Sequence, residues 1–313
     1  MNKPLVIALG GNALQSGKGP ADAASQLAVV HQTAAQLARI LETGQRLAIV
    51  HGNGPQVGRI VLQNEAAAAI TPAMPFDVCG AMSQGMIGYH IQQALGEKMG
   101  RAGLPGRPVT LVTQVRVDGE DPAFVNPSKP IGPFYSREEA EGIAETKGYV
   151  MKEDAGRGWR RVVASPLPLE IVELAQVRAL LEAGFVPITA GGGGIPVVAA
   201  GAGLEGVAAV IDKDLAAWRL AEGLDAGTLM ILTEVEQVYL RYGKEDQQAL
   251  GAISAEEMRA YAAEGHFAAG SMGPKVEAAL RFVEGGPGRR AVITRLDLAL
   301  EGLAGGRGTQ LRS

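Results

Sequence analysis

Short, almost wholly apolar runs alternate with amphipathic segments along most of the chain. A run without polar alternation is typical of a strand that is buried on both faces, as in a parallel sheet covered by helices. The runs that fit this description are Leu5–Leu9, Leu47–His51, Val109–Val117, Phe185–Thr189, Thr228–Thr233 and Ala291–Thr294. The pattern therefore predicts an α/β protein with a largely parallel sheet.

Helices are predicted between these runs by apolar spacing and by end signals. Apolar residues recur every three or four positions from Leu27 to Leu41, and Gly44 is placed to end that helix. Ser254 and Glu257 form a capping-box pattern at the start of another helix. Pro274 suits the first turn of a third helix, because the fixed φ of proline is compatible with a helix start.

The segment from Asp118 to Pro166 breaks this rhythm, because it is rich in proline, glycine and charge. Its alternating pieces at 149–152 and 159–163 indicate small hairpins. A stretch of about 48 residues is too long for a structureless loop in a compact domain. We therefore predict an inserted hairpin subdomain at about 118–166.

Composition and charge exclude several classes of protein. The 313 residues are 47% hydrophobic and 20% charged, which is not typical of a disordered chain. A net charge of −4 without long single-sign runs argues against a nucleic-acid or anionic-membrane partner. The single Cys79 allows no internal disulfide and no cysteine-rich metal site.

The N-terminal apolar run meets Gly10 too early for a signal peptide, and no run of about 18 apolar residues is present. A cytoplasmic protein that does not span a membrane is expected. The spacing of histidine, cysteine and carboxylate residues suggests no metal site, so no metal-binding residue is predicted.

Four glycine-rich turns form the first group of candidate site residues. We expect each of them to follow a strand, and ligands of open α/β sheets bind outside the carboxyl ends of strands. Glycine lets backbone N–H groups approach an anion at a helix start, although it is also needed simply to make a tight turn. Together the turns favour a cleft for phosphate and carboxylate groups. They are Gly10-Gly11-Asn12, His51–Gly58, Gly191–Gly194 and Gly270–Lys275.

Three lysines give a sharper signal. Lys213 lies between Asp212 and Asp214 at a predicted helix start, where the alternative is a surface ion cluster. Lys275 occupies the first turn of a helix, where a cation opposes the macrodipole at a cost of about 0.3–1 kcal/mol, so an anion is expected there. Lys129 is held between prolines in the insert and is placed to reach over the cleft as a lid.

Common motifs for other chemistries do not fit. The chain has no P-loop, and the spacing from Gly52 to Gly58 has one residue too many for a dinucleotide fingerprint. The segment Ala81–Gly85, with Ser83 at its centre, nearly matches a nucleophile elbow, but alanine replaces its first glycine and no strand precedes it. His51 ends a strand beside a glycine turn, so either a ligand contact or a structural role is open. Cys79 has no positive neighbour that would activate it as a nucleophile.

Phosphoryl transfer requires mainly positioning and charge neutralisation, and an acceptor that is already an anion requires no general base. The glycine turns and the lysines could supply both the positioning and the charge neutralisation. Three hypotheses stay open: a kinase with a small anionic acceptor, a kinase acting on an amino-acid carboxylate or a nucleoside monophosphate, and a non-catalytic nucleotide-binding regulator.

These motifs resemble those of the carbamate kinases of the amino acid kinase fold over essentially the whole chain. The pieces beginning at Lys129-Pro130-Ile131-Gly132 and Gly156-Arg157-Gly158-Trp159 are the most specific. The resemblance implies a three-layer αβα sandwich with an open, mainly parallel sheet of about eight strands, usually in a homodimer. It implies reversible phosphoryl transfer between ATP and carbamate, run toward ATP from carbamoyl phosphate in arginine fermentation, with Mg²⁺ carried by the nucleotide.

The resemblance also assigns residues to roles. Residues 1–205 would form a lobe that binds the acceptor and residues 206–313 a nucleotide-binding lobe, on one continuous sheet. The catalytic residues would be Lys129, Lys213 and Lys275, with Asp214 orienting the lysines. The acceptor would bind at Gly10, Gly11, Asn12, Gly52, Asn53 and Gly54. The nucleotide would bind at Gly191, Gly192, Thr233, Tyr239, Tyr242, Met272, Gly273 and Pro274.

Overall fold

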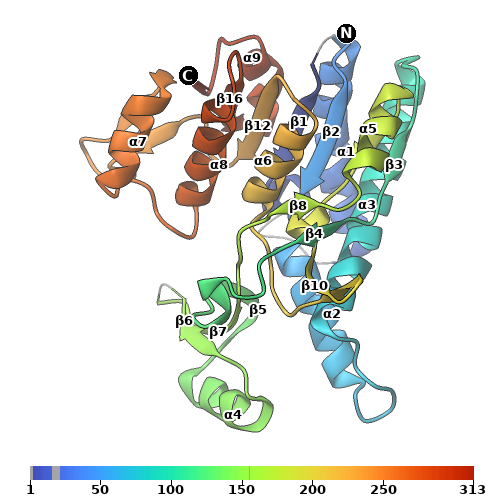
Figure 1. The fold of residues 1–313 in the computed structure, drawn as a ribbon, viewed down its shortest axis with the longest axis vertical. Coiled ribbons are helices and arrows are strands. Elements are labelled where there is room, and N and C mark those ends of the chain that lie inside the picture. Colours follow the sequence, from blue (N-terminus) through green and yellow to red (C-terminus); the bar gives the residue numbers. More distant parts are fainter. Residues whose placement is uncertain (1–2, 16–21, 155) are drawn as a thin grey trace.

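The computed structural model describes residues 3–15, 22–154 and 156–313, in which an eight-stranded sheet lies between layers of helices (Figure 1). Neighbouring strands are parallel except for the antiparallel pair β16 and β17. The predicted open, mainly parallel sheet is confirmed. In spatial order its strands are Ala252–Ser254 (β15), Thr309–Arg312 (β17), Arg290–Arg295 (β16), Thr228–Thr233 (β12), Leu5–Leu9 (β1), Leu47–His51 (β2), Val186–Ile188 (β9) and Pro108–Thr110 (β3).

Three helices begin or end at the signals that the sequence predicted. Asp22 caps the first helix and Gly44, with φ +77°, follows its end. Ser254 and Glu257 form the expected capping box, and Pro274 lies in the first turn of its helix. The α-helices of the described residues are Ala23–Glu42 (α1), Gly54–Ala66 (α2), Phe76–Arg101 (α3), Arg137–Lys147 (α4), Leu174–Glu182 (α5), Lys213–Gly223 (α6), Ala255–Ala263 (α7), Met272–Glu284 (α8) and Ala299–Leu303 (α9).

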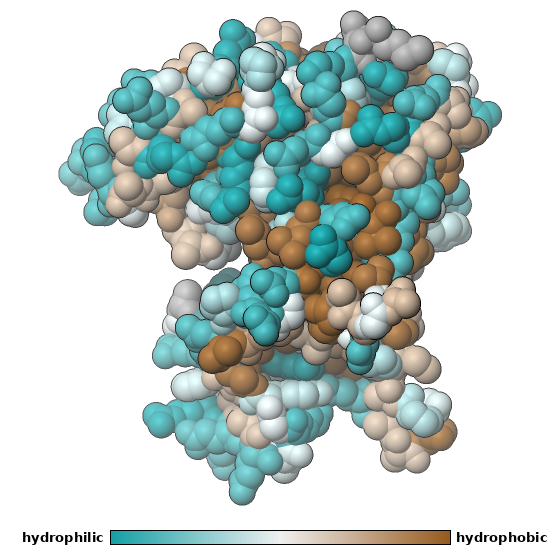
Figure 2. Space-filling view, viewed as in Figure 1, coloured by the Kyte–Doolittle hydropathy of each residue, from teal (hydrophilic) through white to brown (hydrophobic). Residues whose placement is uncertain are grey.

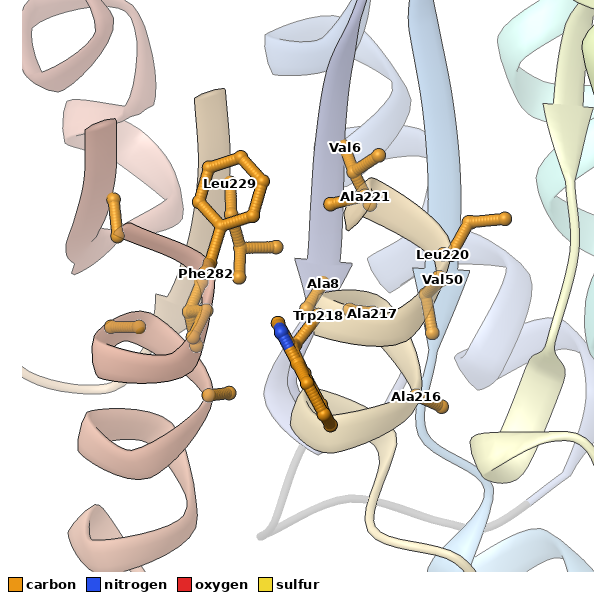
Figure 3. Packing of buried hydrophobic residues seen from close by; sticks show 14 of the residues in the cluster. Val6, Ala8, Val50, Ala216, Ala217, Trp218, Leu220, Ala221, Leu229 and Phe282 are labelled. Carbon is orange, nitrogen blue, oxygen red and sulfur yellow. The ribbon is translucent and has the colours of Figure 1, made fainter. Parts of the chain in front are cut away.

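The central strand β1 explains why its sequence is an uninterrupted apolar run. Successive side chains of a strand point to opposite faces of the sheet. Leu5, Ile7 and Leu9 therefore enter the core under α1, α3 and α9, whereas Val6 and Ala8 pack against the layer of α5, α6 and α8 (Figure 3). Both faces of the sheet are thus covered, as the three-layer architecture requires.

One predicted strand is wrong. The run Val109–Val117 is two strands in different sheets, β3 in the main sheet and β4 (Gln114–Arg116) in a second, four-stranded sheet. Between them, Thr113 turns the chain, because its N–H binds the side chain of Gln84 instead of a ladder partner. Apolar character alone does not reveal such a change of sheet. The other strands of the second sheet are Glu170–Ile171 (β8), Ile195–Ala200 (β10) and Gly203–Gly206 (β11).

The inserted segment folds as a small separate sheet below the main body in Figure 1. The expected hairpin is present as β6 (Met151–Glu153) and β7 (Trp159–Val163), and β5 (Lys129–Tyr135) pairs with β7 on its other side. Helix α4 was not predicted, although Ser136 and Glu139 form a capping box at its start. That signal is present in the sequence, within a segment that is otherwise rich in proline, glycine and charge.

The insert touches the main body at α2. Gly58 of α2 faces Gly132 of β5 so closely that a Cβ on Gly58 would lie 2.8 Å from the Cα of Gly132. The outline of the molecule narrows between the main body and the insert (Figure 2). Within the described ranges, no helix combines the length and the apolar character that a membrane span requires.

Candidate active site

Two of the predicted glycine turns lie side by side at the carboxyl edge of the sheet. Strands β1 and β2 are parallel and pair Leu9 with His51, so the turns that follow them start at the same level. The N–H of Gly52 donates to the carbonyl of Leu9 at 3.1 Å. Gly10 and Gly11 begin a 3₁₀ turn after β1, while Gly54 begins α2. The side chain of Asn12 lies outside what the structure describes.

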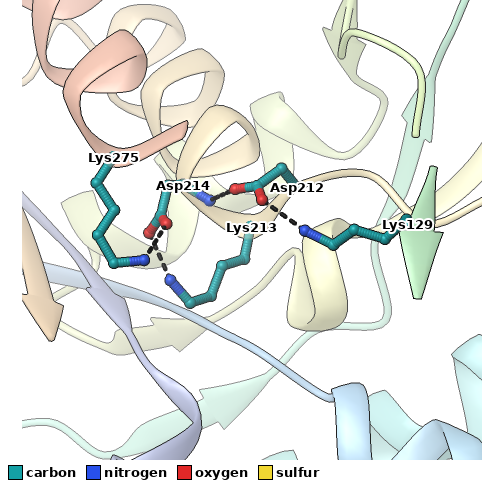
Figure 4. A network of polar contacts seen from close by, with 5 residues as sticks. All are labelled: Lys129, Asp212, Lys213, Asp214 and Lys275. Atoms are coloured by element: carbon teal, nitrogen blue, oxygen red, sulfur yellow. Dashed lines mark hydrogen bonds and ion pairs between the residues drawn. The ribbon is translucent and has the colours of Figure 1, made fainter. Parts of the chain in front are cut away.

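One buried carboxylate holds two of the predicted lysines (Figure 4). The Nζ of Lys213 lies 2.5 Å from Oδ1 of Asp214, and the Nζ of Lys275 lies 3.0 Å from Oδ2. The Asp214 side chain is 2% exposed and those of the lysines are 15% exposed. Helices α6 and α8 thus bring together two ammonium groups, and the pairing of Lys275 with Asp214 spans 61 positions of the sequence.

Lys213 also borders the turn after β2. A Cβ on Gly52 would lie 3.3 Å from the Cδ of Lys213, so a side chain at position 52 would press on this lysine. Glycine therefore allows the lysine stem to run alongside the turn. The candidate acceptor turn and Lys213 of the lysine pair therefore lie side by side.

Lys129 reaches the same cluster from the insert. Its Nζ lies 2.6 Å from Oδ2 of Asp212, whose Oδ1 accepts a hydrogen bond from the N–H of Asp214 at 2.9 Å (Figure 4). Asp212 is thus the N-cap of α6 and also the partner of Lys129. This double role was not predicted, although aspartate directly before a helix start is a signal for an N-cap.

The electrostatics of the cluster favour an anion. Burial alone would raise the pKa of Asp212, but Lys129 and Lys213 together lower it to about 2. Burial lowers the pKa of Lys213, against the opposing effect of the Asp214 carboxylate. Three ammonium groups share two carboxylates in this cluster, which leaves an excess of positive charge.

The glycine run at 191–194 packs against two parts of the candidate site, the turn at Asn53 and the backbone before α6. Gly192 has φ +68°, and a Cβ there would lie 2.1 Å from Nδ2 of Asn53. A Cβ on Gly193, which has φ +93°, would lie 2.1 Å from the carbonyl oxygen of Ile211, just before α6. The structure therefore places this run between the candidate acceptor turn and the start of α6.

The remaining candidate nucleotide residues lie in the C-terminal part of the chain. Thr233 ends β12, and Tyr239 lies on the short strand Val238–Leu240 (β13), with its ring centroid 5.9 Å from that of Tyr242. Tyr242 is 66% exposed. Thr233 and Tyr239 are half-buried.

Met272, Gly273 and Pro274 form the start of α8, directly before Lys275. The turn that contains them follows α7 and a loop, so the expectation that a strand precedes it is wrong. The local sequence signalled the helix start correctly, but nothing in it distinguished a preceding strand from a preceding helix.

His51 and Cys79 are buried in the protein. The Nδ1 of His51 donates to the carbonyl of Gly52 at 2.9 Å, and burial lowers the pKa of the ring to about 4. The imidazole is therefore neutral at physiological pH and supports the turn. Burial also raises the pKa of the Cys79 thiol.

We expect protonation of His51 to make stability depend on pH. In the unfolded chain the ring binds a proton below its ordinary pKa of 6.5, while the folded protein excludes that proton until about pH 4. Unfolding therefore becomes more favourable as pH falls through this window, by about 3 kcal/mol at its lower end. Urea unfolding of the wild type and of His51→Gln at several pH values measures the difference.

The variant His31→Gln, which replaces a partly exposed histidine of α1, serves as the control for the pH measurement. It is expected to keep the wild-type dependence on pH, whereas His51→Gln flattens it. Equal slopes in the wild type and in His51→Gln would show that the buried ring does not carry the effect.

Comparison with known proteins identifies the family of the chain. A sequence model of the amino acid kinase family matches residues 3–295. The carbamate kinase of Pyrococcus furiosus is 51% identical over an alignment that covers 99% of this chain and 99% of its own. The carbamate kinase of Clostridium perfringens is 51% identical over 98% of this chain and 99% of its own. Carbamate kinase from Giardia lamblia bound to AMP-PNP superposes with a TM-score of 0.93 at 46% identity, covering 99% of this chain and 98% of that one. The chain therefore belongs to the amino acid kinase family, on its carbamate kinase branch.

Proposed function

We propose that this protein is a carbamate kinase, which transfers a phosphoryl group reversibly between ATP and carbamate. The observation that carries the proposal is the buried Asp214 carboxylate, which holds Lys213 and Lys275 beside the glycine turn at Gly52. Relatives about half identical over their full length bear the name carbamate kinase, and one was solved with an ATP analogue.

The acceptor binds at the two adjacent turns that end β1 and β2. Backbone N–H groups of Gly10 and Gly11, with the start of α2 at Gly54, suit a small planar anion, because a helix start attracts negative charge. The N–H of Gly52 joins the two turns through its hydrogen bond to Leu9. Asn12 and Asn53 complete this side of the site. Carbamate is already ionised, so its oxygen attacks the γ-phosphorus without a general base while the bond to the β-phosphate oxygen breaks.

The lysines stabilise the charge that moves during this step. Lys213 and Lys275 hold the nucleotide phosphates, and Asp214 keeps both ammonium groups in place. Lys129 leaves Asp212 to approach the transferred phosphoryl group from the insert. Each charged donor contributes on the order of 3–4 kcal/mol at the transition state, by analogy with the loss of one oxyanion-hole donor.

Mg²⁺ enters as part of the nucleotide substrate, since the aspartates of the cluster are already paired with lysines. The base and sugar lie against Thr233, Tyr239 and Tyr242 and the start of α8, with the glycine run at 191–192 behind the phosphates. In this assignment residues 1–205 bind the acceptor and residues 206–313 bind the nucleotide.

We further propose a cytoplasmic homodimer that forms ATP from carbamoyl phosphate in arginine breakdown. Met82 and Tyr89 of α3 and Val112 after the edge strand β3 are each at least 46% exposed, which supports an interface on this side of the sheet. Light scattering of the purified protein measures its mass, and a monomer at micromolar concentration would contradict the dimer.

A coupled assay that detects ATP formed from ADP and carbamoyl phosphate tests the activity. We expect turnover with this pair and none with aspartyl phosphate, glutamyl phosphate or UDP as the phosphoryl donor. Turnover with one of these donors instead would indicate another acceptor class. Binding of ATP with no turnover of any donor would indicate a regulator.

A further inference from the structure

The hydroxyl of Ser83 lies against the acceptor turn. Ser83 belongs to the segment Ala81–Gly85, which resembles a nucleophile elbow, but it lies within α3 and has no exposed surface. Its Oγ is 2.6 Å from the carbonyl oxygen of Gly80 and 2.8 Å from Nδ2 of Asn53. The serine therefore contacts a residue of the candidate acceptor site and is closed to substrate.

These two contacts determine which way the Asn53 amide faces. The carbonyl of Gly80 can only accept, so it takes the hydroxyl proton of Ser83. The Oγ of Ser83 is then left as an acceptor, and only the NH₂ end of Asn53 can donate to it. Although Asn53 is the N-cap residue of α2, its side chain makes no capping hydrogen bond. The amide is held by Ser83 instead.

Packing holds the same amide from another side without distinguishing its ends. A Cβ on Gly192 would lie 2.1 Å from Nδ2 and 2.7 Å from Oδ1 of Asn53. The glycine backbone thus restricts the movement of the side chain. An amide oxygen and an NH₂ group have nearly the same shape, however, so packing cannot select between the two orientations. The hydrogen bond to Ser83 makes that selection.

The neighbouring Gln84 holds the glycine run itself. Its Nε2 donates to the carbonyls of Gly191 at 3.0 Å and Thr113 at 3.1 Å, and its Oε1 accepts from the N–H of Thr113 at 2.8 Å. Two consecutive residues of α3 therefore support the acceptor turn, one through the Asn53 amide and one through the backbone that packs on it.

We propose that Ser83 is a positioning residue for the acceptor, which keeps the Asn53 amide in the one orientation that matches carbamate and carbamoyl phosphate. The inference rests on the proposed function, in which Asn53 contacts the acceptor. Ser83 itself touches no substrate and forms no covalent intermediate.

The variant Ser83→Ala tests the proposal in the direction of ATP formation. Without the hydroxyl, the buried NH₂ group of Asn53 loses its acceptor and the amide is free to turn over. We expect kcat/KM for carbamoyl phosphate to fall about tenfold, the size expected when a buried donor loses its partner, while KM for ADP stays unchanged. Ser83→Thr retains a hydroxyl and is expected to restore most of the loss.

Thr43→Val is the matched control for Ser83→Ala. Thr43 donates to the carbonyl three residues earlier at 2.6 Å, as Ser83 does, but lies at the end of α1 and holds no site residue. Removal of the Thr43 hydroxyl is expected to leave the KM values for carbamoyl phosphate and for ADP unchanged. A purely structural role for Ser83 would instead lower kcat and leave the KM values for carbamoyl phosphate and ADP unchanged. That result would overturn the inference.

A double-mutant cycle separates the action of Ser83 on Asn53 from other effects. In an Asn53→Ala background the further change Ser83→Ala is expected to have no additional effect on kcat/KM, and an additive loss overturns the inference. Where Ser83→Ala fails to fold, Ser83→Cys, with its weaker hydrogen bonding, is measured in its place. A wild-type protein that forms no ATP overturns the proposed function itself, and the inference with it.

Discussion

Replacing Lys213 by methionine is expected to lower kcat at least about 100-fold with the fold intact. Methionine fills a similar volume but removes the ammonium group that borders Gly52 and pairs with Asp214. Negative charge that develops on the phosphates then loses one of its fixed partners. Lys275→Met, which removes the other partner of Asp214, is expected to have an effect of the same order. Steady-state kinetics in the coupled assay measures both variants.

The exposed ion pair of Lys3 with Asp225, at 2.9 Å, offers a control for the lysine variants. Lys3→Met removes an ammonium group that lies outside the cluster, so kcat is expected to equal that of the wild type. Circular dichroism and the unfolding midpoint establish that each variant is folded. Near-normal turnover of either cluster variant would show that its lysine does not hold the phosphates.

Replacing Asp214 by asparagine is expected to cause the largest loss of stability among changes in the cluster. Removing one partner of a buried ion pair leaves the other charge uncompensated, at a cost of about 3–5 kcal/mol. Here two ammonium groups, both largely buried, lose the same carboxylate at once. The free energy of unfolding in urea measures the change, and kcat is expected to fall as well, because neither lysine stays in place.

Two comparisons make the Asp214 experiment specific. Asp225→Asn breaks the exposed pair with Lys3 and is expected to leave the free energy of unfolding within error of the wild type. Addition of AMP-PNP is expected to raise the unfolding midpoint of Asp214→Asn, since bound phosphates replace the missing negative charge. A variant as stable as the wild type would indicate that the lysines do not depend on this carboxylate.

The reliability of the sequence predictions follows the range over which each signal acts. Strands β1 and β2 were predicted with their observed bounds, because burial on both faces requires an uninterrupted apolar run. The run Val109–Val117 failed because Thr113 turns between two sheets through a contact with Gln84, 29 residues away. Helix α4 had a local signal in its Ser136 capping box that was not used.

In the candidate site, too, the features with a local sequence signal were predicted and the contacts between distant residues were not. Lysine beside carboxylates and glycine after strands are visible in a window of a few residues, so the sequence singled out Lys213, Lys275 and both acceptor turns. The pairing of Lys129 with Asp212 spans 83 positions and that of Asn53 with Ser83 spans 30. No local pattern predicts contacts over such intervals.

The sequence alone therefore determined the type of sheet, several of the helix starts and the kinds of charged groups available, since these depend on local periodicity and capping. The tertiary structure alone decided which groups share a carboxylate and which hydroxyl holds the Asn53 amide. These choices depend on how the ends of β1 and β2 meet α3, α6 and α8, and the geometry of that meeting is set by packing across the whole core.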